Sequence, residues 1–211
     1  MHSRRSGKWK TTVSISPATT VPDYALVEGL RAGDEEAFAE VFRRHYPTVY
    51  TVLLRLTGSP EEAEDLVQEV FMRLYERPLD GGAEVNLGGW LYRVASNTGF
   101  NALRSRRRRW NNLLRWARLE RPLGAESPNP AAEAERKATA GAIRETLAEL
   151  PERDRTALIL RHSGVSYAEI AAALDVKPGS VGTILARAER ALRKRYLAMH
   201  PDAGEERGGG W

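Results

Sequence analysis

The fold is decided by residues 59–76, which read Ser-Pro-Glu-Glu-Ala-Glu-Asp-Leu-Val-Gln-Glu-Val-Phe-Met-Arg-Leu-Tyr-Glu. Ser59 can cap a helix, Pro60 suits its first turn, and Glu62 can complete a capping box. Large apolar residues then recur at steps of three and four: Leu66, Val67, Val70, Phe71 and Leu74. This spacing predicts an amphipathic helix that runs to about Glu76.

Upstream of this helix, residues 23–57 also carry apolar side chains at helical steps. The pair Gly33-Asp34 divides them into a short and a longer helix, and Pro47 is expected to kink the longer one. Residues 1–22 are rich in Ser, Thr and Arg and have few large apolar groups. We therefore interpret them as a disordered N-terminal tail.

Downstream, residues 77–86 are predicted as a loop, and Asn86 is a candidate N-cap for a helix that reaches about Arg109. Prolines and a glycine interrupt residues 111–134. We interpret this stretch as a flexible linker, because such residues break helical patterns. Its first part, through Trp116 and Leu119, could also extend the preceding helix or pack transiently.

Residues 135–198 are helical again and contain a second recognisable pattern. Ser166 and Glu169 can form a capping box for a short helix, and a turn and a longer helix follow. This arrangement is typical of a helix-turn-helix. Because no segment alternates with period two, the sequence predicts an all-α fold. We expect two small helical domains, 23–110 and 135–198, and a flexible C-terminal tail at 199–211.

The composition excludes several classes of protein. The chain has 211 residues, no cysteine and only four histidines, which are scattered. It therefore has no disulfide, no thiol nucleophile and no supply of clustered metal ligands, and we expect neither a metal nor a cofactor. No segment has the pattern of a membrane span or a secretory signal, so the sequence predicts a cytoplasmic protein without membrane insertion.

Acidic and basic side chains are separated along the chain, although the formal net charge is only +4. The helix over 60–76 is strongly acidic and has Arg73 as its only cation. The next helix ends in a run of arginines: Arg104, Arg106, Arg107, Arg108 and Arg109. Like charges at this density repel one another, and a polyanion relieves the repulsion while releasing its own counterions. The run therefore indicates a nucleic-acid partner, with a solvated helix end as the alternative.

A polar stripe precedes this run on the same helix. Arg93, Asn97, Asn101 and Arg104 follow one another at steps of four, four and three, which places them on one face. Arginine and asparagine can bond to base edges and phosphates, and Trp90 and Tyr92 can stack on an unpaired base or pack in the core. The stripe predicts a surface for single-stranded or partly opened DNA.

The helix-turn-helix predicts a contact with duplex DNA. In such motifs the second helix enters the major groove by its N-terminal turns. The candidate DNA-contacting residues in and around these turns are Lys177, Ser180, Thr183, Arg187 and Arg190.

Taken together, these segments resemble the sigma factors of the extracytoplasmic-function (ECF) type of bacterial RNA polymerase. Residues 37–42 and 62–71 resemble the family's polymerase-binding segment, and 90–109 resemble its promoter-melting helix. Residues 150–153 and 166–171 resemble its −35-binding domain. The segments also follow one another in the order of the family.

The resemblance implies a role for each group of candidate residues. Core RNA polymerase would bind the acidic helix through Glu62, Asp65, Leu66, Gln68 and Glu69. The −10 element of promoter DNA would be melted and held by the loop at 78–86 and by Trp90, Arg93, Asn97, Asn101, Arg104, Arg106, Arg107, Arg108 and Arg109. The helix-turn-helix would read the −35 element, and an anti-sigma factor is a common further partner in the family.

Two positions depart from the family's pattern. The recognition helix reads Gly182-Thr183-Ile184 where a Lys-Ser-Arg-like run is common, which puts strong −35 readout in doubt. Asn101 stands where an Asp is frequent, which affects either the −10 preference or a local hydrogen bond.

Three alternatives account for the sequence less fully than a non-catalytic sigma factor. A stand-alone helix-turn-helix regulator would need neither the acidic helix nor the N-terminal domain. An enzyme would need a base to match the carboxylates of the acidic helix, and the sequence offers no such His or Lys nearby. A structural RNA-binding protein would explain the arginine run but not the helix-turn-helix.

Overall fold

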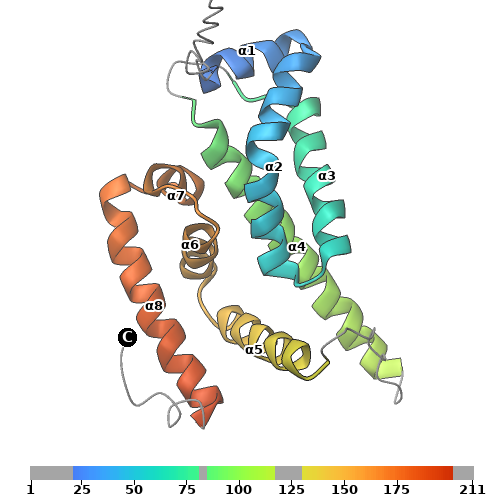
Figure 1. Ribbon diagram of the computed structural model, residues 1–211, viewed down its shortest axis with the longest axis vertical. Coiled ribbons are helices and arrows are strands. Elements are labelled where there is room, and N and C mark those ends of the chain that lie inside the picture. The colour runs from blue at the N-terminus through green and yellow to red at the C-terminus, as the bar shows by residue number, and fades with distance from the viewer. Residues whose placement is uncertain (1–20, 81–84, 117–129, 202–211) are drawn as a thin grey trace, which may run out of the picture.

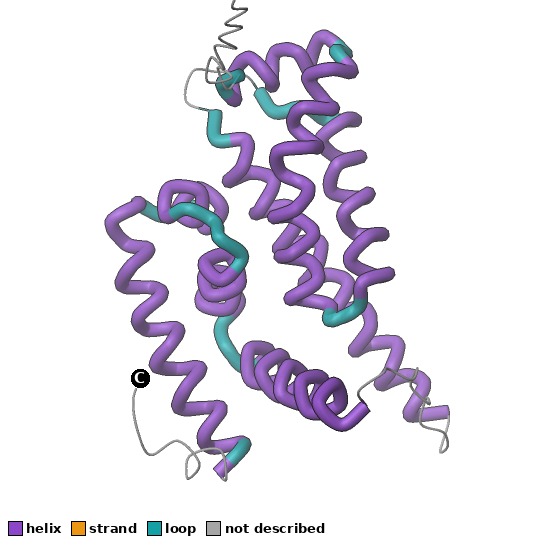
Figure 2. Tube along the Cα trace, in the orientation of Figure 1, coloured by secondary structure: helices purple, strands orange, loops and turns teal. Residues whose placement is uncertain are grey.

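The computed structural model describes residues 21–80, 85–116 and 130–201 of the chain. The side chains of residues 107, 109–116 and 130–137 are not part of this description. Within the described residues every regular element is a helix, which confirms the all-α prediction (Figures 1 and 2).

The helices form two halves that follow one another along the chain (Figure 1). The N-terminal half contains α1 (Asp23–Ala32), α2 (Glu35–Thr57), α3 (Pro60–Glu76) and α4 (Leu87–Trp116). The C-terminal half contains α5 (Pro130–Ala148), α6 (Glu152–His162), α7 (Tyr167–Leu174), the 3₁₀ turn η1 (Pro178–Ser180) and α8 (Val181–Met199).

Local capping interactions fix where the helices begin. The Ser59 hydroxyl accepts a hydrogen bond from the backbone N–H of Glu62 at 3.2 Å, and the Asn86 side chain accepts one from Gly89 at 2.6 Å. Ser166 and Glu169 form the predicted capping box of α7. These contacts satisfy backbone donors that have no partner inside the helix, which is why the three starts could be predicted.

One local prediction is corrected by the structure. Glu62 does not close a capping box at the start of α3, because its carboxylate pairs with Arg106 of α4 at 3.2 Å. Pro47 lies inside α2, which continues as a helix on both sides of it. Proline removes one helical hydrogen bond there, and the packing of α2 against α3 and α4 stabilises the helix around it.

The predicted linker over 111–134 is shorter than expected at both ends. α4 continues to Trp116, and α5 begins at Pro130, a residue that suits the first turn of a helix. Residues 117–129 lie outside the described residues, as do most of both predicted tails (1–20 and 202–211) and residues 81–84 of the predicted loop.

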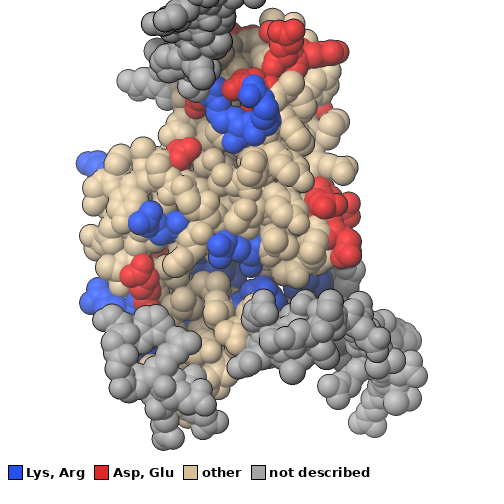
Figure 3. Space-filling model, in the orientation of Figure 1, with Lys and Arg blue, Asp and Glu red and all other residues tan. Residues whose placement is uncertain are grey.

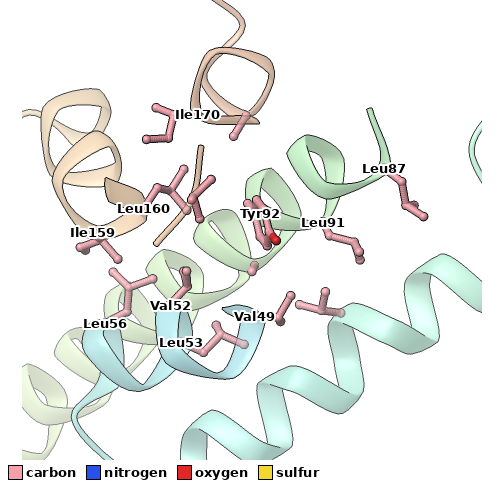
Figure 4. Packing of buried hydrophobic residues seen from close by; sticks show 14 of the residues in the cluster. Val49, Val52, Leu53, Leu56, Leu87, Leu91, Tyr92, Ile159, Leu160 and Ile170 are labelled. Atoms are coloured by element: carbon pink, nitrogen blue, oxygen red, sulfur yellow. The ribbon is translucent and has the colours of Figure 1, made fainter. Parts of the chain in front are cut away.

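The hydrophobic core continues from one half into the other. In the N-terminal half, α2, α3 and α4 bury a cluster that includes Val49, Leu53 and Leu91. Figure 4 shows that α6 and α7 add Ile159, Leu160 and Ile170 on the side of this cluster that is formed by Val52, Leu56 and Tyr92. The two halves are therefore packed together, with α7 against α4 and α6 against α2.

Candidate functional site

The acidic face of α3 is open to solvent. Asp65, Gln68 and Glu69 are exposed, and Leu66 is half-buried beside them. Glu69 also forms an ion pair with Arg73 one turn further along the helix. Figure 3 shows acidic side chains gathered over α3 at the right edge of the molecule, apart from the basic side chains in its lower middle. This face can accept a basic partner surface.

Glu62 differs from the other predicted members of this face. Its carboxylate is turned toward Arg106, and only 26% of its side chain is exposed. Arg106 also donates to the carbonyl oxygen of Thr57, the last residue of α2, at 3.3 Å. The pair joins α4 to the α2–α3 turn, so both residues hold the N-terminal half together.

After Arg106, only Arg108 of the arginine run has a side chain that the structure describes. It is exposed and donates to the Ser105 hydroxyl of its own helix at 3.4 Å. The side chains of Arg107 and Arg109 lie outside the described part of the chain. The end of α4 thus presents at least one guanidinium to solvent.

The polar stripe of α4 lies on the face that meets the C-terminal half. Asn97 and Asn101 are exposed, as predicted. Arg93, however, donates from Nε to the carbonyl oxygen of Ala173 at 3.0 Å and from its terminal nitrogen to that of Ala172. These carbonyls belong to the last turn of α7, where backbone acceptors lack helical partners. Part of the predicted DNA surface therefore binds protein in this arrangement.

Arg104, at the other end of the stripe, also reaches the C-terminal half. Its guanidinium lies 2.8 Å from the Glu152 carboxylate, at the start of α6, and donates to the Asn101 side chain at 2.8 Å. Next to it, the guanidinium of Arg155 sits 4.2 Å from the centre of the Phe100 ring. Burial lowers the pKa of Arg155. Such a stacked cation stabilises the contact between α6 and α4.

The two aromatic residues near the stripe have different surroundings. Trp90 is half-buried and packs against the core, which leaves part of its ring accessible. Tyr92 is buried, and its hydroxyl lies 3.3 Å from Nδ1 of the buried His45. Burial, followed by the nearby Glu169 carboxylate, raises the pKa of Tyr92 to about 12. Tyr92 is therefore a core residue rather than a platform for a base.

Two glycines allow α7 to approach the start of α4. A Cβ atom on Gly89 would lie 2.5 Å from the Cβ of Ala172, and one on Gly88 would lie 2.6 Å from a carboxylate oxygen of Glu169. Real side chains do not tolerate such separations, so the contact requires glycine at least at position 89.

The helix-turn-helix has the predicted geometry. α7 ends at Leu174, and the next residue, Asp175, has a φ of 56°, in the left-handed region that turns the chain. η1 then leads into α8. Lys177, Ser180 and Thr183 are exposed around its first turn, and Gly182 has open space around it. Ile184 is buried, so it is a core residue of the motif and not a missing base contact.

Arg187 and Arg190 lie further along α8 and differ in their partners. Arg187 binds the buried carboxylate of Asp154 through two nitrogens, with Nε 3.2 Å from the carboxylate oxygen. This hydrogen bond raises the pKa of Arg187. Arg190 is exposed and donates to the Ala186 carbonyl of its own helix. Arg187 is thus held by α6, which reduces its freedom to follow DNA.

The residues that sequence reasoning missed are the protein partners of the predicted DNA-contacting side chains. They are Glu152, Asp154, the carbonyls of Ala172 and Ala173, and the Gly88-Gly89 pair. Only the glycine pair left a signal in the sequence, since two adjacent glycines at a helix start often permit a close approach.

Two kinds of feature are absent from the described part of the chain. Residues 21–80, 85–116 and 130–201 contain no cluster of three or more His, Cys, Asp or Glu side chains arranged to hold a metal ion. Across the same part of the chain, no helix combines the length and the apolar character needed to span a membrane.

Comparisons with known proteins agree with the two-part organisation. The family model "Sigma-70 region 2" matches residues 41–109, and "Sigma-70, region 4" matches residues 140–192. The ECF RNA polymerase sigma factor SigE of Mycolicibacterium smegmatis is 34% identical over 80% of this chain, and the match spans 65% of that protein's length. The ECF RNA polymerase sigma-E factor of Escherichia coli is 32% identical over 84% of this chain and 95% of that protein.

A solved structure has a similar fold. The sigma factor RpoE from Bartonella quintana, solved in complex with the anti-sigma factor NepR, superimposes with a TM-score of 0.51. The similarity covers 76% of this chain and 96% of that one, at 22% sequence identity.

Proposed function

Because the chain belongs to the ECF sigma factors of bacterial RNA polymerase, we propose that it binds the core enzyme and selects promoters through contacts of its two halves with DNA. It acts as a dissociable specificity subunit with no chemical step of its own. The observation that carries the proposal is the separation of an exposed acidic face on α3 from a polar and basic face on α4, beside a helix-turn-helix.

The acidic face of α3 binds a basic surface of the core enzyme. Asp65, Gln68 and Glu69 are exposed along the helix and supply charge and hydrogen-bond acceptors, and Leu66 supplies a partly apolar centre. Opposite charges on the two partners steer their encounter and fix their register. Glu62 contributes less to this contact, because Arg106 already neutralises it.

The exposed stripe of α4 captures the opened −10 element. Asn97 and Asn101 can bond to base edges, Trp90 offers part of its ring for stacking, and Arg108 neutralises phosphate. Arg93 and Arg104 join this surface when their contacts with the C-terminal half are released. Melting is then driven by binding energy for the separated strand, since unstacking a base costs a few kcal/mol.

The helix-turn-helix reads the −35 duplex through the start of α8. Lys177, Ser180 and Thr183 present donors at the turn that enters a major groove, and Arg190 follows toward the phosphates. Gly182 adds no donor, so this half contributes modest readout. Tethering to the N-terminal half compensates, because two linked contacts bind more tightly than either one.

We also propose where this chain acts and what kind of protein regulates it. A sigma factor acts on chromosomal promoters, so we expect this chain to work in the cytoplasm. RpoE, which has a similar fold, was solved in complex with an anti-sigma factor. We propose that a protein of this kind also binds this chain.

Run-off transcription with purified core polymerase on a library of promoter fragments tests the proposal. We expect transcripts that depend on both the chain and the core enzyme, and the library then yields the promoter motif. A stand-alone regulator would bind promoter duplexes without the core enzyme and would produce no run-off product. That outcome would replace the sigma-factor proposal.

A variant of α3 tests the polymerase-binding face separately. Asp65→Ala combined with Gln68→Ala should weaken binding to core polymerase by about tenfold, a loss of ~1.4 kcal/mol. Circular dichroism should stay unchanged, because both side chains are exposed. The control is Glu28→Ala, an exposed acid of α1, which should keep normal affinity. Equal affinity of the two variants would contradict the assigned face.

A further inference from the structure

Asp23, the first residue of α1, is bound to Leu87, the first residue of α4. Its Oδ2 accepts a hydrogen bond from the backbone N–H of Leu87 at 3.0 Å, across 64 positions of sequence. Figure 1 shows how the two meet: α1 crosses the end of the N-terminal half at which α4 begins. A side chain of one helix therefore caps another helix.

The carboxylate of Asp23 serves α4 and α2 rather than its own helix. Oδ1 lies 3.4 Å from a guanidinium nitrogen of Arg44 in α2, and the same guanidinium donates to Glu40 at 2.9 Å. Among the described residues, no hydrogen bond of this carboxylate goes to α1. Asp23 thus connects the starts of α1 and α4 to the middle of α2.

The first turn of α4 depends on such side-chain contacts. Leu87 is followed by Gly88 and Gly89, and glycine is one of the weakest helix formers. The first four N–H groups of a helix also have no partner inside it. Here Asn86 accepts from Gly89 at 2.6 Å, and Asp23 accepts from Leu87. The negative charge of Asp23 is favourable at this helix N-terminus as well.

Without the Asp23 contact, the start of α4 has to move. Leu87 is fully buried, and a buried donor that has lost its partner is costly. The turn therefore has to shift until water reaches this N–H. The shift is passed on to Trp90, because only the glycine pair separates Trp90 from Leu87.

Trp90 is the side chain of this turn that the proposed function uses. Its ring is half-buried and packs against the core, so only part of it is open to a base. Aromatic stacking has a preferred geometry, which a displaced ring no longer offers. Arg93 and Asn97 follow Trp90 on the same helix, so their positions depend on the same first turn.

We propose that Asp23 is a positioning residue for promoter opening, which holds the first turn of α4 so that Trp90 is in place to capture the separated −10 strand. The role in strand capture rests on the proposed function, whereas the tie between α1 and α4 does not. Asp23 contacts no DNA in this role. It also acts separately from polymerase binding, which uses the exposed face of α3.

The first test measures the tie in the free full chain. Hydrogen exchange of the Leu87 amide, followed by NMR, should be about tenfold faster in Asp23→Ala than in the parent chain. Asp23→Asn should keep the parent rate, because its amide oxygen still accepts from Leu87. An unchanged rate at Leu87 in Asp23→Ala would overturn the proposal. This measurement needs neither polymerase nor promoter.

The matched control for both tests is Asp34→Ala. Asp34 caps α2 by accepting from the backbone N–H groups of Glu36 at 2.8 Å and Ala37 at 3.4 Å. The control therefore removes a helix cap of the same chemistry without touching α4. It should lower the melting temperature, as Asp23→Ala should, but leave exchange at Leu87 unchanged.

The second test measures strand capture by each variant assembled with core polymerase. The probes are a promoter fragment whose −10 segment is left single-stranded and a duplex fragment that carries the −35 element alone. Asp23→Ala should bind the first probe about tenfold more weakly than the parent chain does, on the scale of one lost base stack. It should bind the second probe normally. Asp23→Asn should restore binding to the first probe, and Asp34→Ala should bind both like the parent.

A purely structural role for Asp23 gives a different result. Asp23→Ala and Asp34→Ala would then bind the single-stranded probe equally well, and that outcome would overturn the proposal. A parent chain that binds neither probe with core polymerase would instead overturn the proposed function. Exchange at Leu87 would still decide whether Asp23 holds the start of α4.

Discussion

At the scale of single residues, arginine makes the contacts that join distant parts of this chain. Arg93 reaches the carbonyls that end α7, Arg106 reaches the carbonyl that ends α2, and Arg187 binds Asp154. A guanidinium is planar, permanently charged and rich in donors, so it suits both carbonyl and phosphate oxygens. The same side chains can therefore serve the folded free chain and a complex with DNA.

The pair Arg187–Asp154 leads to a prediction about stability. The Asp154 carboxylate is buried, so it depends on Arg187 for compensation. Arg187→Ala should lower the melting temperature by several degrees, measured by circular dichroism. Adding Asp154→Asn should restore part of the loss, because it removes the uncompensated charge. Arg190→Ala, which touches only its own helix, is the control. An effect of Arg187→Ala no larger than that of Arg190→Ala would contradict the assigned role.

His45 leads to a prediction about pH. Burial lowers its pKa below 6.5; Asp23 and Glu169 oppose the shift, and Arg44 adds to it. As the pH falls below about 6.5, the unfolded chain therefore binds a proton before the folded chain does, and the folded state loses stability. The loss reaches at most about 1.4 kcal/mol per pH unit and ends below the folded pKa.

Urea unfolding between pH 7 and pH 5 measures this effect. His45→Gln should flatten the pH dependence of the unfolding free energy, whereas His162→Gln, at an exposed position of α6, should retain it. An equally steep dependence in His45→Gln would assign the effect to other groups.

At the scale of elements, the helix starts could be predicted because each depends on neighbouring residues. Ser59, Asn86 and Ser166 cap their helices through bonds that span three residues. The end of α4 could not be predicted in the same way. The apolar pattern ends near Arg109 and leaves open whether the next residues extend the helix, and the structure continues it to Trp116.

The arginine run at the end of α4 leads to a prediction that separates its members. Arg106 holds the α2–α3 turn, whereas Arg108 is exposed. Arg106→Ala should therefore lower the melting temperature. Arg108→Ala should leave it unchanged and reduce the slope of log affinity against log salt by about 1 in binding to single-stranded DNA. A normal salt slope in Arg108→Ala would remove Arg108 from the DNA surface.

At the scale of the whole molecule, the order of the segments could be predicted but the packing of the halves could not. The spacing of Arg93 and Arg104 predicted that they share one polar face of a helix, and both are exposed. Nothing in their spacing showed that the two would contact α7 and α6, respectively. The contact depends on backbone carbonyl groups and on Ala172, which form no distinctive sequence pattern. Its partners also lie more than 40 residues apart in the sequence.

The shared core leads to a last prediction, on cooperativity. Since Ile159 and Leu160 of α6 join the cluster that contains Val52 and Leu56 of α2, the halves should unfold as one unit. Native-state hydrogen exchange should give the most protected amides of α2 and α6 the same opening free energy. Ala172→Gln, which fills the space at Gly89, should split this value into two, with the C-terminal half the less stable because it then loses the contacts with α4. Ala138→Gln, at an exposed alanine of α5, should preserve a single value. Two distinct opening free energies in the parent chain would show that the halves fold independently and that their contact contributes little to stability.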